Sequence, residues 1–278
     1  MIIAVASGKG GTGKTTIAVN LALSLENVQY LDCDVEEPNG AIFLNPSIKK
    51  RISVAIPVPE FDETKCTHCK KCVEACAYNA IVVLGQKILF FPQLCHGCGG
   101  CRLICPENAI TEQPRQIGLI EQGPSGAIDF IQGLLNVGEP MATPIIKQQR
   151  KLIDKEKIVI LDAPPGTSCP VIETVRNSDY CILVTEPTPF GLNDLKLAVE
   201  TMREMRVPFG VVINCSDIGN AEVKNYCINE NIPVLLELPW DRRIAEAYSR
   251  GESAVAIIPE MKKDFHRMYN SILTKVCA

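Results

Sequence analysis

Eight of the fourteen cysteines in this 278-residue sequence form two runs with the same spacing. Each run reads C-x2-C-x2-C-x3-C, and the second repeats the first at a constant offset of 29 residues, together with the Asn-Ala-Ile that follows it. This spacing lets three thiolates of one run hold a 4Fe–4S cluster while the fourth reaches the cluster of the other run. The sequence therefore predicts two 4Fe–4S clusters, one on Cys66, Cys69, Cys72 and Cys105, the other on Cys95, Cys98, Cys101 and Cys76.

Zinc is the alternative metal for these runs. His68 and His96 lie inside them, so two zinc sites could be assembled from the same residues. The repeated tight spacing matches tetrahedral zinc pairs poorly and favours clusters. The first run departs from the usual pattern in having Ala77 where proline follows the last cysteine, which removes no ligand.

A glycine-rich motif near the N-terminus could bind phosphate. It fits G-x-x-x-x-G-K-[ST], follows an apolar strand-like run and opens a helical segment, as this motif requires. Backbone N–H groups of such a loop wrap the phosphates, Lys14 is expected to pair with the β- and γ-phosphates, and Thr15 to ligate Mg²⁺. The expected ATP-binding residues are Gly8, Lys9, Gly10, Gly11, Thr12, Gly13, Lys14, Thr15 and Thr16.

The form K-G-G-T-G-K-T resembles the deviant Walker A motif of the MinD/ParA/Mrp/nitrogenase-iron-protein class of ATPases. The resemblance implies that Lys9 reaches across a dimer interface, so that two protomers sandwich two ATP molecules. It also implies that Asp34 is the switch I aspartate that orients the attacking water, and that Asp162 holds Mg²⁺ on switch II, where Gly166 offers an N–H to the γ-phosphate. Catalytic roles thus fall to Lys9, Lys14, Asp34 and Asp162, and Mg²⁺ to Thr15, Asp34 and Asp162.

Adenine contacts are expected near the C-terminal strands, at places that resemble the adenine-binding positions of the same class. Asn214 ends an apolar run there, and its amide could both donate to and accept from the base. Pro239 and Asp241 follow the next run and flank Trp240, the only tryptophan, for which packing is as plausible as base contact.

The elements that must position these residues read as strands alternating with helices. Continuous apolar runs are typical of buried parallel strands, and they lie at Ile2–Ala6, Val28–Asp32, Ile158–Asp162, Cys181–Thr185, Gly210–Asn214 and Val234–Leu238. Helical patterns lie at Thr15–Leu25, Leu192–Met205 and Asn220–Asn229. This order predicts an α/β fold with a doubly wound, mostly parallel sheet.

The middle of the chain breaks the alternation from about residue 40 to residue 157. The cysteine repeat there resembles a bacterial-type ferredoxin, which implies a small inserted α+β domain at 58–116 between two parts of a P-loop ATPase domain, 1–57 and 117–278. The stretch 117–157 is expected to return to the sheet through a Gly- and Pro-containing segment and a helix around 147–153. Proteins with this arrangement are MinD-family ATPases with an inserted ferredoxin domain.

Composition excludes some function classes. A net charge of −4 gives no basic surface for nucleic acid, and neither a signal peptide nor an 18-residue apolar stretch is expected, which favours a cytoplasmic protein without a membrane partner. The C-terminal segment 261–278 reads as a helix docked on its own domain. Cys33, Cys181 and Cys215 are expected in the core, and Cys227 and Cys277 have no assigned role. Cys169 follows Asp162 at the offset of the cluster-bridging cysteine of the nitrogenase iron protein, although a structural role is favoured.

Three functions remain open at this level. The leading one is a dimeric ATPase switch that couples nucleotide state to iron–sulfur clusters, in electron transfer or in cluster assembly and delivery to an unidentified redox or cluster-accepting protein. The second is a MinD-like positioning or regulatory ATPase with structural or sensory clusters. The third is an ATP-dependent biosynthetic enzyme like the dethiobiotin and cobyrinate synthetases, for which no substrate pocket could be assigned.

Overall fold

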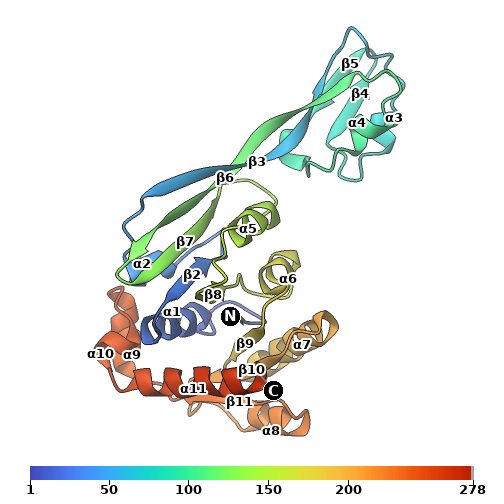
Figure 1. Cartoon of the computed structure of the whole chain (residues 1–278). Helices are drawn as coiled ribbons and strands as arrows, with labels where there is room; N and C mark the ends of the chain where they lie inside the picture. The colour runs from blue at the N-terminus through green and yellow to red at the C-terminus, as the bar shows by residue number, and fades with distance from the viewer. Residues whose placement is uncertain (277–278) are drawn as a thin grey trace.

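The computed structural model describes residues 1–276, and one large sheet of nine strands organises this part of the chain (Figure 1). Its strand order is β11-β10-β9-β1-β8-β2-β7-β6-β3. The strands are β1 (Ile2–Ala6), β2 (Val28–Asp32), β3 (Lys50–Phe61), β6 (Ile110–Ser125), β7 (Ile128–Leu135), β8 (Ile158–Asp162), β9 (Tyr180–Thr185), β10 (Phe209–Asn214) and β11 (Val234–Leu238). From β11 to β7 all neighbours are parallel, which confirms the predicted α/β fold with a mostly parallel sheet.

Helices cover both faces of the sheet. They are α1 (Lys14–Ser24), α2 (Gly40–Leu44), α5 (Thr143–Arg150), α6 (Cys169–Val175), α7 (Pro189–Met205), α8 (Glu222–Asn229), α9 (Arg242–Ser249), α10 (Ala254–Ile257) and α11 (Met261–Val276). Side chains alternate between the faces along each strand. In β1, Ile3 and Val5 pack toward α1 and α11, whereas Ala4 and Ala6 pack in the core that contains α5, α6 and α7.

The C-terminal helix α11 docks on this body as expected. Met261, Phe265, Met268 and Ile272, spaced three or four residues apart, are buried in the same core as α1. Cys277 lies outside the described residues. No helix within residues 1–276 is both long enough and apolar enough to cross a bilayer.

The stretch between β2 and β8 differs from the sequence-based expectation. The segment that was expected to lead back to the sheet itself contributes strands to it, because 110–125 and 128–135 form β6 and β7. The helix expected around 147–153 is α5, at Thr143–Arg150. Pro114 and Pro124 argue against a strand at β6, because proline is depleted in central strands.

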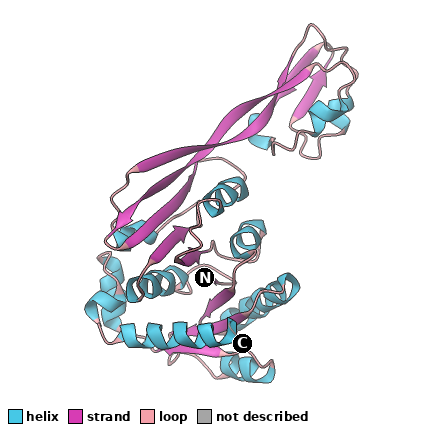
Figure 2. Cartoon of the chain, in the orientation of Figure 1, coloured by secondary structure: helices cyan, strands magenta, loops and turns pink. Residues whose placement is uncertain are grey.

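Strands β3 and β6 form a ribbon that leaves the sheet. They pair antiparallel from Lys50–Gln122 to Phe61–Ile110, whereas β7 accompanies β6 only from Gly118 onward. The outer half of the ribbon is therefore two-stranded, and it carries residues 62–109 away from the helices and sheet (Figures 1 and 2).

Residues 62–109 form a small α+β unit. It contains α3 (Lys71–Glu74), β4 (Ile81–Leu84), β5 (Lys87–Phe90), the 3-10 turn η1 (Pro92–Leu94) and α4 (Gly100–Ile104). The 29-residue repeat is visible in its geometry, since Phe61 pairs with Ile110 in the ribbon and Phe90 pairs with Ile81 in the β4–β5 sheet. Each half of the repeat thus pairs its first strand with the last strand of the other half.

Candidate functional site

The phosphate-binding motif forms the loop between β1 and α1, at the carboxyl edge of the parallel strands. Two of its glycines are required by close contacts. A Cβ on Gly8 would lie 2.2 Å from the carbonyl oxygen of Asp194, and Gly13 has φ of 87° with its Cβ position 2.4 Å from the Asn214 amide. Asn214 Nδ2 also donates to the Thr12 carbonyl at 3.0 Å. The end of β10 therefore holds the loop in shape.

Lys14 is buried and faces the acidic ends of the neighbouring strands. Its Nζ donates to Asp162 Oδ1 at 3.0 Å, and Tyr30 donates to Asp162 Oδ2 at 2.9 Å. Burial disfavours the lysine charge, but the nearby carboxylates outweigh it and raise the pKa of Lys14. A phosphate is the other kind of anion that could pair with this ammonium.

Asp34 and Asp32 stand beside this pair on the segment after β2. Burial, together with repulsion from Asp162, raises the pKa of both carboxyl groups, that of Asp34 to about 6. Asp32 accepts hydrogen bonds from the backbone of Asp34 and Gly40, so it shapes the turn. Asp34 lines the cleft. A divalent cation would satisfy this concentration of carboxylates.

A cleft with about 1410 Å³ of empty space, partly open to solvent, covers the loop. Ten of the expected residues line it: Gly10, Gly11, Gly13, Lys14, Thr15, Thr16, Asp34, Asn214, Pro239 and Asp241. Gly8, Lys9, Thr12, Asp162 and Gly166 stand behind or beside that lining. The cleft also contains Glu37, Asn39, Glu186 and Tyr248, which the sequence analysis missed. The first three follow the carboxyl ends of β2 and β9, which is where ligands of open parallel sheets bind.

The residues expected at the adenine end play unequal parts. Trp240 is 51% exposed on the cleft wall, where a base could stack. Asp241 is occupied in the structure itself, because its carboxylate caps α9 by accepting from the backbone of Arg243 and pairs with that side chain.

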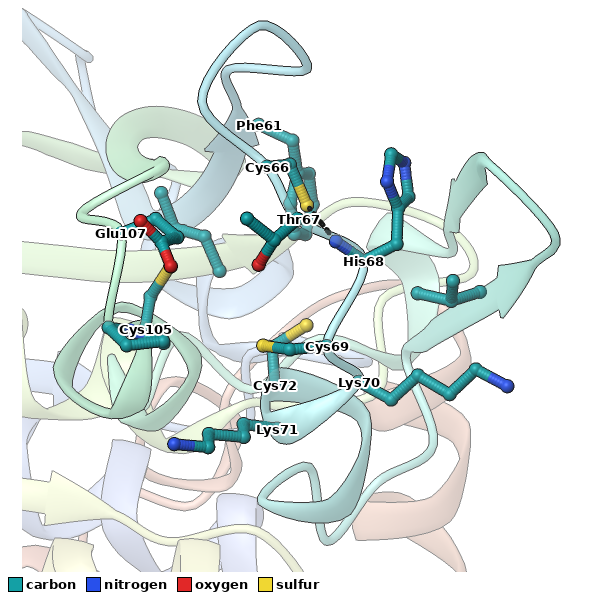
Figure 3. A pocket seen from close by; sticks show the side chains of 13 residues that line it. Phe61, Cys66, Thr67, His68, Cys69, Lys70, Lys71, Cys72, Cys105 and Glu107 are labelled. Atoms are coloured by element: carbon teal, nitrogen blue, oxygen red, sulfur yellow. Dashed lines mark hydrogen bonds between the residues drawn. The ribbon is translucent and has the colours of Figure 1, made fainter.

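The eight cysteines of the two runs surround two cavities in the unit 62–109. The first, called here the tip cavity, has about 380 Å³ of empty space, and Cys66, Cys69, Cys72 and Cys105 line it. Figure 3 shows it with those cysteines around it. The second, called the ribbon cavity, has about 410 Å³ and is lined by Cys76, Cys95, Cys98 and Cys101 together with Pro57 and Pro59 of the ribbon. Each cavity draws three cysteines from one run and the fourth from the other.

Backbone N–H groups point at the sulfurs in a pattern that repeats between the two runs. His68 N donates to Cys66 Sγ at 3.4 Å and Gly97 N to Cys95 Sγ at 3.5 Å. Ala80 N and Ala109 N donate to Cys76 and Cys105, both at 3.3 Å. Such bonds stabilise thiolates and are one of the features that set cluster potentials.

The cavities therefore fit a 4Fe–4S cluster by their donor set. Within residues 1–276, no three Cys, His, Asp or Glu side chains converge on a point where one metal ion could sit. The thiols line the walls of a space instead, as corner ligands of a cubane do. When bound, a cluster there supplies one-electron redox chemistry, while the chain supplies thiolates, N–H donors and shielding from water.

An aromatic pair separates the two cavities. Phe61 lines the tip cavity and Phe90 the ribbon cavity, and their ring centroids lie 6.1 Å apart. The two residues are equivalent in the repeat. Tyr78 and His96 stack in parallel on the ribbon cavity with centroids 3.5 Å apart.

The remaining cysteines take other positions. Cys33, Cys181 and Cys227 are buried, and Cys215 is half-buried in the cleft wall. Cys169 is exposed at the start of α6 and lines neither cysteine cavity.

Comparison with known proteins gives a consistent family. Residues 3–255 match the family model described as the CobQ/CobB/MinD/ParA nucleotide binding domain. An uncharacterized protein of Methanocaldococcus jannaschii is 33% identical over 259 residues, covering 91% of this chain and 91% of that protein. An iron-sulfur cluster carrier protein of Pyrococcus horikoshii is 27% identical over 273 residues, covering 90% of this chain and 77% of that protein.

A solved structure shares the fold. The septum site-determining protein MinD from Pyrococcus horikoshii, complexed with Mg-ADP, superposes with a TM-score of 0.60 at 18% identity, covering 98% of this chain and 95% of that chain. At that identity the likeness shows the fold alone.

Proposed function

Because the chain belongs to the CobQ/CobB/MinD/ParA nucleotide-binding family, we propose that it is a dimeric ATPase switch whose nucleotide state is coupled to two 4Fe–4S clusters held in an inserted ferredoxin-like domain at 58–116. One observation carries this proposal: two crossed sets of four cysteines surround cavities on a ribbon that continues into the sheet bearing the phosphate-binding loop.

The nucleotide half of the proposal assigns roles to groups at the cleft. MgATP binds with its β- and γ-phosphates at Lys14 and its base toward Trp240. Thr15, Asp34 and Asp162 hold the cation, and Gly166 offers its N–H to the γ-phosphate. Asp34 orients the attacking water, for which its position on the cleft wall is suited.

A homodimer completes the nucleotide site. Phe190, Ile218 and Trp240, which are 78%, 62% and 51% exposed, lie on segments that follow β9, β10 and β11. All three therefore stand at the same carboxyl edge as the cleft. A second copy would cover these apolar side chains, and Lys9 of each protomer would then reach the nucleotide of the other.

In this proposal, the nucleotide state controls the two clusters. Eight thiolates and their N–H donors hold the two clusters, with Phe61 and Phe90 between them. A relative named an iron-sulfur cluster carrier makes delivery of clusters a second outcome beside electron transfer. Both outcomes need a protein partner, a redox acceptor in one and a cluster acceptor in the other.

The test is an anaerobic preparation in which iron and sulfide are counted per chain, followed by potentiometric titration with MgATP and with MgADP. About eight irons per chain are expected from two cubanes. A nucleotide-dependent potential supports redox coupling. Cluster delivery is supported if the clusters are complete and their potentials do not depend on the nucleotide, but they transfer to an apo-protein when ATP is added. Zinc in place of iron contradicts the proposal.

A further inference from the structure

Arg115 occupies a distinctive place on the ribbon. It lies in β6 directly opposite Ile56 of β3, and cross-strand partners point to the same face. That face carries the cysteine loop, because a Cβ on Gly97 would lie 3.2 Å from Ile56 Cβ and 3.0 Å from the Pro57 carbonyl. Arg115 therefore stands under the loop that begins at Cys95, and its side chain is only 21% exposed.

The guanidinium of Arg115 is partly satisfied. It makes a two-pronged ion pair with Glu139, one bond of which is 2.9 Å between Nη2 and Oε2. Its Nε is buried and has no acceptor among the described residues. Gly97 lines the ribbon cavity, so the ribbon face that carries Arg115 is the face on which that cavity lies. Within residues 1–276, one N–H of this cation thus lacks an acceptor on the ribbon face that carries the loop beginning at Cys95.

Glu139 connects this cation to the nucleotide cleft. It follows β7 in a turn, where its N–H bonds to the Asn136 carbonyl at 3.1 Å and the Asn136 N–H bonds to Ile117 at 2.9 Å. The preceding residue, Leu135, donates to the carbonyl of Val35 at 2.8 Å. Val35 is the neighbour of Asp34, which lines the cleft. A run of short backbone contacts therefore joins the segment after β2 to the turn that holds Arg115.

We propose that Arg115 is the positioning residue through which nucleotide state acts on the cluster of the ribbon cavity, with Glu139 as its adjustable counter-charge. The inference rests on the proposed function and specifies which cluster responds and through which contact. A cluster held there would gain negative charge on reduction, which the positive charge of Arg115 would stabilise. Movement of the segment around Asp34 shifts the β7–α5 turn, and with it the distance of Glu139 from that charge.

The experiment compares four variants with the wild-type chain. Arg115→Gln removes the positive charge, Arg115→Lys keeps it, and Glu139→Gln removes the counter-charge. Arg51→Gln is the matched control, because Arg51 also forms an ion pair on the ribbon, with Glu121 at 2.7 Å, but lies at the end that joins the sheet and not at the residues next to the cysteine loop. Each protein is titrated with dithionite in an optical cell with MgATP and with MgADP, after its iron content is counted.

Removing the positive charge and removing its counter-charge should shift the reduction potential of the same cluster in opposite directions. Arg115→Gln should make reduction of one cluster about tenfold less favourable, a fall of about 59 mV for a one-electron couple. Glu139→Gln should raise the same potential, Arg115→Lys should restore most of the loss, and Arg51→Gln should change nothing. In Arg115→Gln and Glu139→Gln the difference between MgATP and MgADP should vanish.

Two other results distinguish failure of this inference from failure of the proposed function. If the wild-type potential depends on nucleotide and both Arg115→Gln and Glu139→Gln keep that dependence, the inference is overturned while the proposed function stands. If the wild-type potential ignores the nucleotide, the proposed redox coupling fails. The sign pattern of the variants then decides alone whether Arg115 acts on the cluster.

Discussion

Lys14 and Asp162 form an ion pair of 3.0 Å in which the side chains are 8% and 0% exposed. Breaking a buried pair by removing one partner is costly, because it leaves a charge without compensation. Here the remaining charge would be one of three neighbouring carboxylates, since Asp32 and Asp34 are also close.

The first prediction follows from that pair. Lys14→Met should lower the free energy of unfolding of the nucleotide-free chain by about 3 kcal/mol and abolish stabilisation by MgATP. The double variant Lys14→Met/Asp162→Asn, which leaves two carboxylates in place of three, should regain part of the stability but none of the binding. Urea unfolding with and without MgATP measures both effects. Equal losses in the single and double variants would contradict the electrostatic reason.

Lys9 is expected to act between protomers and not within one. Lys9→Ala should therefore bind MgATP nearly as tightly as wild type, yet remain monomeric when the nucleotide is present. Light scattering after gel filtration with a non-hydrolysable ATP analogue checks this, with Lys155→Ala as the control on an exposed lysine distant from the loop. A Lys9→Ala chain that still dimerises with the analogue would rule out the cross-interface role.

Asp34 should matter for hydrolysis more than for binding. Loss of a group that orients the attacking water typically costs 10²–10⁴-fold in rate. Asp34→Ala should lower single-turnover phosphate release by at least about 100-fold. Glu37→Ala, another acid on the cleft wall, is the matched control and should retain most of the rate. Comparable losses in the two variants would mean that cleft charge in general, and not Asp34, supports the reaction.

Trp240 offers a direct signal of nucleotide binding. It is the only tryptophan in the sequence, and it is 51% exposed on the cleft wall. Bound nucleotide should shield or quench it, so tryptophan emission should change in a saturable way with MgATP and stay constant in Lys14→Met. If emission does not respond while calorimetry detects binding, the base lies elsewhere in the cleft.

The crossed cysteine sets can be tested by pairs of substitutions. Cys66→Ala and Cys105→Ala should remove the same cluster, and Cys95→Ala and Cys76→Ala the other, each lowering iron from about eight to about four per chain. Low-temperature electron paramagnetic resonance of the reduced proteins would distinguish the two losses. Cys215→Ala, a half-buried cysteine outside both cavities, should retain all iron. A spectrum that groups Cys105 with Cys95 would contradict the crossing.

The parts of the fold that the sequence predicts well are those with one dominant signal. Six strands were expected from continuous apolar runs, and four of them, including Ile2–Ala6 and Val234–Leu238, have the expected bounds. A strand buried on both faces is apolar at most positions, so its burial is evident from the sequence. The P-loop is also predicted well from the sequence, because close contacts, such as that of Gly13 with Asn214, require its glycines.

The ribbon strands could not be predicted in this way. β3 contains Pro57 and Pro59, and β6 contains Pro114 and Pro124, residues that argue against a central strand. Pro57 and Pro59 are tolerated because β3 is an edge strand. Pro114 lies where β6 has no β7 neighbour, and Pro124 lies past the last residue of β6 that pairs with β3. Whether a strand is central or at an edge depends on its neighbours, which the local sequence does not contain.

The missing parts of the site have the same origin. Neither Arg115 nor Glu139 belongs to a motif in the sequence, and no spacing rule relates them. The register of β6 on β3 places Arg115 under the cysteine loop, and the turn after β7 places Glu139 next to Arg115. Their roles therefore emerge from the pairing of strands.

The last residue pairs of the ribbon, next to residues 62–109, indicate how such a chain could have arisen. Phe61 pairs with Ile110, and the Asp62 N–H bonds to the Ala109 carbonyl at 2.8 Å, so the two ends of 62–109 leave from neighbouring positions. A two-residue turn could join the same two positions as an ordinary hairpin. An ancestral hairpin loop could thus have accepted a foreign gene fragment without disturbing any strand of the host sheet, and its descendants could lose that fragment as cleanly as they gained it.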